Sequence, residues 1–144
     1  MAISKKFLLA GNAIFTIESV NPNYRPHYTY RIQKVEASDR WKESYFVKLL
    51  AGPDNTSDYI YLGKLDTFTG QVIVTAKSER QKETFPFRLL NRILARVWAD
   101  DHTAYEQYGY QTHHAGRCGR CGKVLTVPTS IETGLGPECQ KILS

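Results

Sequence analysis

The stretch Tyr28-Thr-Tyr-Arg-Ile-Gln-Lys-Val35 decides the fold class. Tyr28, Tyr30 and Ile32 fall on one side of an extended chain, and the polar residues between them fall on the other. This period of two is typical of a half-buried β-strand, because successive side chains point to opposite faces of a sheet. The stretch therefore predicts a strand with one face against a core.

Neighbouring runs extend this strand into a sheet. Apolar and β-branched residues recur at residues 13–20, 45–51, 59–65 and 71–75. Turn-forming residues separate these runs, among them Gly52-Pro53-Asp54-Asn55 and Gly70. Strands spaced so closely predict an antiparallel β-meander or small barrel of about five strands.

A helix should follow the strands. Pro86 suits a first helical position, where its missing N–H needs no partner. Apolar residues then recur at helical spacing from Phe87 to Trp98, so this face should cover the sheet. The expected class is α+β, with a sheet-and-helix domain over residues 1–112 and a small metal-binding module over residues 113–144.

The same helix carries a basic stripe. Arg88, Arg92 and Arg96 stand four residues apart on the face opposite the apolar one, and residues 77–99 hold six Lys/Arg against two Asp/Glu. Clustered guanidinium groups are typical of phosphate-binding surfaces. A solvated helix face is the alternative, since arginine is also a good helix former.

Composition limits the classes of protein. The chain has 144 residues, 42% hydrophobic and 23% charged, with a net charge of +5. These values are ordinary for a globular protein, and the apolar runs fall far short of the roughly 18 residues that cross a bilayer. The three cysteines cannot all pair within one chain. They favour a metal or redox site in a cytoplasmic protein over a secreted disulfide scaffold.

The cysteines form the strongest chemical motif. Cys118-Gly-Arg-Cys121-Gly is a pattern of zinc knuckles, because two intervening residues let both sulfurs reach one tetrahedral ion. Cys139 follows 18 residues later, beside a Pro137 that should begin a final helix reaching about Leu143. His113 and His114 stand five and four residues before Cys118, so spacing permits either ring as the fourth ligand. The motif predicts a structural Zn²⁺ site.

Other chemistries fit the residues less well. A redox Cys-x-x-Cys would leave the third cysteine and the histidine pair unexplained. The His-x-Glu and Pro-Cys-x-x-Cys signature of zinc deaminases is missing from the sequence. Asp100-Asp101-His102 is interpreted as a helix exit loop, and no paired carboxylates, nucleophile motif or phosphate-binding glycine loop is recognisable. The sequence therefore predicts a protein without enzymatic activity.

The run from Cys118 to Cys139, ending in Gly134-Leu-Gly-Pro-Glu-Cys139, resembles the C-terminal zinc motif of a domain family of unknown function. That family is common in phages and actinobacterial genomes. The resemblance implies a phage protein with a small treble-clef-like zinc knuckle, and it implies His114 as the histidine ligand, four residues before the first cysteine. It implies no activity, because the family has none established.

Two classes of function remain. The first is an accessory protein that binds DNA or RNA, for which the basic candidates are Arg88, Arg92, Arg96, Arg117, Arg120 and Lys123. Tyrosines would add stacking surfaces if a sheet face is exposed, with Tyr28, Tyr30, Tyr59 and Tyr61 as the candidates. The second class is a module that binds a host or phage protein, for example to inhibit a host enzyme or defence complex.

Overall fold

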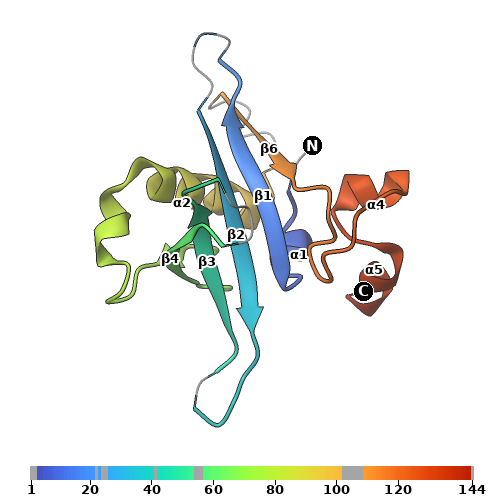
Figure 1. Cartoon of the computed structure of the whole chain (residues 1–144), viewed down its shortest axis with the longest axis horizontal. Helices are drawn as coiled ribbons and strands as arrows, with labels where there is room; N and C mark the ends of the chain where they lie inside the picture. Colours follow the sequence, from blue (N-terminus) through green and yellow to red (C-terminus); the bar gives the residue numbers. More distant parts are fainter. Residues whose placement is uncertain are drawn as a thin grey trace.

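The computed structural model describes residues 3–21, 23, 26–40, 42–53, 57–101 and 109–143. Asp54, Asn55 and His102, which the sequence places in turns and loops, lie outside these ranges. No described helix is long and apolar enough to span a membrane. In the view of Figure 1, α2 lies behind and to the left of the long strands β1 and β2, and the C-terminal helices lie to their right.

A curled antiparallel sheet forms the centre of the molecule. Its strands are β1 (Asn12–Ser19), β2 (His27–Val35), β3 (Ser44–Leu50), β4 (Tyr59–Leu65), β5 (Val72–Ile73) and β6 (Tyr110–His114). Their order across the sheet is β5-β4-β3-β2-β1-β6, so the first five form the predicted meander, with β5 and β6 at the edges. A mixed α and β structure with an antiparallel sheet is confirmed, and a strand lies in each of the five predicted runs, although β5 covers only Val72–Ile73 of the predicted 71–75.

Strand β6 was not predicted. It pairs antiparallel with β1, with Phe15 opposite His114 and Ser19 opposite Tyr110. The predicted boundary between residues 112 and 113 falls inside this strand, and the division into two domains stays a prediction. Its sequence, Tyr-Gln-Thr-His-His, has too weak an apolar alternation to distinguish a strand from a loop. Thr112 lies on the inward face between Tyr110 and His114, and it is buried where a larger apolar residue would mark a strand.

The helices pack where their apolar residues predict. A short α1 (Lys5–Leu8) precedes β1, and the 3₁₀ helix η1 (Glu79–Glu83) precedes α2 (Phe85–Trp98). Pro86 stands in the first turn of α2, as expected. Six buried side chains of α2 join those of the sheet in one core; they are Phe87, Leu89, Leu90, Ile93, Leu94 and Val97.

Polar contacts fix α2 against the sheet. The buried Tyr30 hydroxyl of β2 donates to the Pro86 carbonyl at 2.7 Å. The Asn91 side-chain amide accepts from the Val72 N–H at 2.7 Å and donates to the Val72 carbonyl at 3.2 Å. It thus makes the two hydrogen bonds to β5 that a neighbouring strand would otherwise make. These contacts hold the apolar face of α2 on the inner face of the sheet and leave its arginines on the far side.

Candidate metal centre

The first two cysteines lie in a tight turn after β6. The N–H of Cys118 donates to the Lys123 carbonyl at 2.8 Å, and the N–H of Gly122 donates to the Cys118 carbonyl at 2.9 Å. Gly122 has a φ of 80°, a conformation that favours glycine. The turn therefore requires the glycine that follows the Cys-x-x-Cys pair.

The third cysteine comes from the end of the chain. Helix α4 (Pro128–Thr133) ends at Gly134, which has a left-handed φ of 76°. Helix α5 (Pro137–Ile142) begins three residues later and carries Cys139 in its first turn, as the sequence predicts. The N–H of Gly119 donates to the Gly134 carbonyl at 2.8 Å. This bond joins the cysteine turn to the connection between the two helices.

Together these elements gather three sulfurs. The Sγ atoms of Cys118, Cys121 and Cys139 lie within 4.8 Å of one another. None of the three is in a disulfide; Cys118 and Cys139 are buried, whereas Cys121 is exposed. Thiolates around one tetrahedral zinc ion stand roughly 3.8 Å apart, given a Zn–S distance of about 2.3 Å. The cluster is close to that spacing and can hold a metal ion.

Backbone N–H groups favour negative charge at this site. Burial raises the pKa of the Cys118 thiol, but hydrogen bonds from the backbone of Cys121, Gly136 and Arg120 outweigh it and lower the pKa to about 7. Burial raises the pKa of Cys139, and its two cysteine neighbours raise it further. A cation would relieve this conflict, because it stabilises all three thiolates at once.

The structure does not place His114 among the cysteines. Its Nδ1 accepts from the Gly116 N–H at 2.9 Å, and its Nε2 contacts the Ile131 carbonyl. His113 points to the other face of the sheet, where its Nε2 lies 3.6 Å from a Glu18 carboxylate oxygen. His114 as a ligand therefore stays a prediction, and it requires the ring to exchange both of these contacts for the ion.

The predicted basic residues fall into two groups. Arg88, Arg92 and Arg96 lie along α2, the first two exposed and the third half-buried, and α2 lies at the opposite end of the view in Figure 1 from α4 and α5. Arg117, Arg120 and Lys123 surround the cysteine turn, and all three are exposed. Arg117 donates to the Gly122 carbonyl, and Arg120 donates to the Cys139 sulfur at 3.6 Å. Arg120 is therefore a contact of a cluster sulfur as well as a candidate for phosphate binding.

Sequence reasoning missed the residue that holds the cysteine turn against the sheet. The Phe7 ring, buried in the main core, lies under both glycines of the motif: a Cβ on Gly119 would lie 2.7 Å from it, and one on Gly134 would lie 2.5 Å from it. Nothing in the local spacing links residue 7 to residues 119 and 134. The antiparallel pairing of β1 with β6 and the hydrogen bond from the Asn12 N–H to the Gly119 carbonyl bring them together.

In the comparison with known families, only the end of the chain has a match. Residues 111–144 match a family of unknown function, DUF6011. The matched part contains the whole cysteine cluster and most of β6. No curated protein and no solved structure matches the chain.

Proposed function

We propose that the C-terminal segment is a treble-clef-like zinc knuckle with a structural Zn²⁺ ion. The observation that carries this proposal is the convergence of three cysteine sulfurs from two separate elements. Thiolates are soft donors that suit zinc, and backbone N–H donors at Cys118 favour the ionised form. With His114 as a fourth ligand the coordination sphere would be full, which leaves no position for a reactive water.

Elemental analysis of the purified protein tests this proposal. We expect one zinc per chain and its loss in Cys121→Ser, because three remaining groups cannot complete the set. His114→Ala should weaken metal binding more than His113→Ala, the matched control one residue away. Absence of stoichiometric zinc would contradict the proposal, and the reverse order of the two histidine variants would reassign the ligand.

For the protein as a whole we propose a non-enzymatic accessory role in binding nucleic acid. The α2 stripe supports it, because Arg88, Arg92 and Arg96 lie on the side of the helix that does not contact the core. Guanidinium groups placed in this way neutralise phosphates without sequence preference. A phage origin and a cytoplasmic location are part of the same proposal.

A salt titration tests the role of the stripe. Labelled single- and double-stranded DNA and RNA are titrated at several salt concentrations with wild type and with the triple alanine variant of Arg88, Arg92 and Arg96. Each lost phosphate contact should flatten the log-log slope of affinity against salt by roughly 0.7 to 0.9. The melting temperature should change little, since the replaced side chains leave the core intact. Absence of binding to all four nucleic acids near 0.1 M salt would contradict the proposal.

Protein binding is the second candidate, and one surface favours it. Val124, Val127 and Ile142 line a cavity of about 360 Å³ beside Cys121 and Cys139, and Val124 and Ile142 are 63% and 61% exposed. Exposed apolar side chains gathered in one place are typical of protein interaction sites. A pull-down tests this surface if the triple alanine variant binds nucleic acid normally or if wild type binds none. The proteins captured by wild type are compared with those captured by Val124→Ser.

A further inference from the structure

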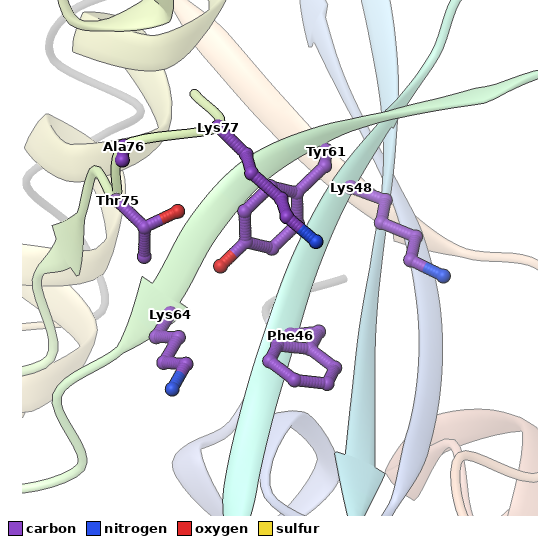
Figure 2. Close-up of a pocket in the computed structure, with 7 residues that line it drawn as sticks. All are labelled: Phe46, Lys48, Tyr61, Lys64, Thr75, Ala76 and Lys77. Atoms are coloured by element: carbon purple, nitrogen blue, oxygen red, sulfur yellow. The ribbon is translucent and has the colours of Figure 1, made fainter. Parts of the chain in front are cut away.

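The face of the sheet away from α2 carries a groove with an aromatic floor. Phe46 of β3 and Tyr61 of β4 lie in a cavity of about 640 Å³ (Figure 2). Lys48, Lys64 and Lys77 stand around the two rings, and Thr75 and Ala76 complete one side. We call these seven residues the β3–β4 groove.

Strand register places these side chains together. Lys48 is directly opposite Tyr61, and a β-bulge after Val47 brings Lys64 opposite Phe46. The bulge needs Gly63, whose φ is 151° and whose Cβ would lie 2.3 Å from the Ile73 carbonyl oxygen. The backbone of β3 and β4 therefore fixes which rings and which lysines share the groove.

The rings are arranged for contact with a ligand. Phe46 and Tyr61 meet edge to face at a centroid distance of 5.8 Å, and the Lys64 Nζ lies 5.7 Å from the Phe46 centroid. Both rings are only half-buried. Tyr59, two residues before Tyr61, continues the aromatic row under the Arg31 guanidinium, 5.9 Å from its centroid. Of the tyrosines predicted for stacking, Tyr59 and Tyr61 lie on this open face, whereas Tyr30 is buried in the core.

Charge selects the kind of partner. The described lining of the groove has three lysines and no carboxylate, so it favours an anion. The rings favour a partner with flat apolar surfaces next to that charge. Single-stranded nucleic acid combines both, because its phosphates alternate with unpaired bases that stack on aromatic side chains. In a duplex the bases are paired and stacked on one another, so their faces are not available to the aromatic side chains.

We propose that the β3–β4 groove binds single-stranded nucleic acid, with bases stacked on Phe46 and Tyr61 and phosphates beside Lys48, Lys64 and Lys77. The inference rests on the proposed nucleic-acid role and adds a second surface to it, on the opposite face of the sheet from the α2 stripe. The stripe would supply charge alone, whereas the groove would supply the preference for unpaired bases.

Variants of the rings test the groove most sharply. A labelled single-stranded oligonucleotide of about ten residues is titrated with Phe46→Leu and Tyr61→Leu, which keep an apolar side chain and remove the ring. Each should weaken binding by about 5- to 150-fold, whereas Phe46→Tyr, which keeps a ring, should bind as wild type does. Phe68→Leu is the matched control, since Phe68 is 91% exposed at the turn between β4 and β5 and outside the groove.

Variants of the lysines separate charge from stacking. Lys48→Ala, Lys64→Ala and Lys77→Ala should each flatten the single-strand salt slope by roughly 0.7, whereas Lys141→Ala on α5 should leave it unchanged. Phe46→Leu should lower affinity by a similar factor at low and high salt, because stacking releases few counterions. Circular dichroism and melting temperature establish that each variant is folded.

The outcomes distinguish this inference from the proposed function. If wild type binds nucleic acid but Phe46→Leu and Tyr61→Leu bind equally well, the groove assignment is wrong and the α2 stripe is retained. Equal affinity for a mononucleotide and the oligonucleotide, or displacement by poly-glutamate with no effect of the ring variants, would also overturn the groove assignment. Failure of wild type to bind any nucleic acid would remove both.

Discussion

The sheet with α2 and the segment after β6 are stabilised in different ways. Nineteen buried hydrophobic residues of the described chain form the main core. The cluster near the cysteines contains Ala10, Cys118, Leu125, Leu135 and Cys139, so two of its five buried members are thiols. A core this small cannot by itself offset the entropy of ordering about 30 residues. We therefore propose that side-chain packing alone holds the sheet region, whereas the cysteine segment depends on the proposed metal ion.

Truncation at the contact between the two regions should have the largest effect. Phe7 is 2% exposed in the main core and lies under Gly119 and Gly134 of the cysteine segment. Phe7→Ala should lower the free energy of unfolding by about 3 to 5 kcal/mol, because it leaves a cavity between the regions. Urea denaturation measures this change. An effect below about 1 kcal/mol would show that the two regions do not depend on this ring.

A glycine of the motif sharpens the same comparison with a smaller effect. Gly134→Ala places a Cβ 2.5 Å from the Phe7 ring at a φ of 76° and should cost roughly 1 to 3 kcal/mol. Gly116→Ala is the matched control, because its φ is 75° and nothing lies within 4 Å of the added atom. The difference between their urea midpoints isolates the contact with Phe7, and equal midpoints would contradict it.

The smallest effect concerns the core of the sheet region alone. Burial raises the pKa of Tyr30 above its ordinary value near 10, and Tyr28 and Tyr110 raise it further. Below pH 10 both folded and unfolded chains keep the proton, so no stability is lost there. Above pH 10 the unfolded tyrosine ionises first, and stability should fall as pH rises.

Tyr30→Phe tests this pH dependence. The variant should lose about 1 kcal/mol near neutral pH, because the Pro86 carbonyl loses its 2.7 Å partner. It should then lose less additional stability above pH 10 than wild type does, because the variant no longer has the Tyr30 hydroxyl, whose pKa is raised by burial. Thermal melts from pH 7 to about 11 provide the comparison, and parallel curves for the two proteins would contradict it.

Local patterns predicted most of this architecture. Alternation identified five strands, and helical spacing with Pro86 located α2, because these signals depend only on residues close in the chain. The Cys-x-x-Cys pair and Pro137 likewise predicted a cluster of three sulfurs, which the structure contains. A tight turn and a helix start each fix the position of a cysteine from local sequence. Such features need no knowledge of the tertiary structure.

The remainder depends on contacts between distant residues. The pairing of β6 with β1 has no signature in Tyr110-Gln-Thr-His-His114, and the same pairing leads His114 to hydrogen bonds outside the cysteine cluster. The β3–β4 groove depends on a bulge at Val47 that shifts the register of Lys64. Periodicity identifies which side chains share a face of one strand, but not which strand lies beside it.

Hydrogen exchange in the presence and absence of a zinc chelator tests the difference between the two regions most directly. After chelation, amides of the cysteine segment such as Gly119, Leu125 and Gly134 should lose their protection, because the proposed zinc ion would supply roughly 10 to 16 kcal/mol of apparent binding energy to that segment. Amides of Ile32 and Val47 should keep theirs, since the sheet is held by its own core. Protection that persists in the cysteine segment, or is lost from both regions together, would contradict the account.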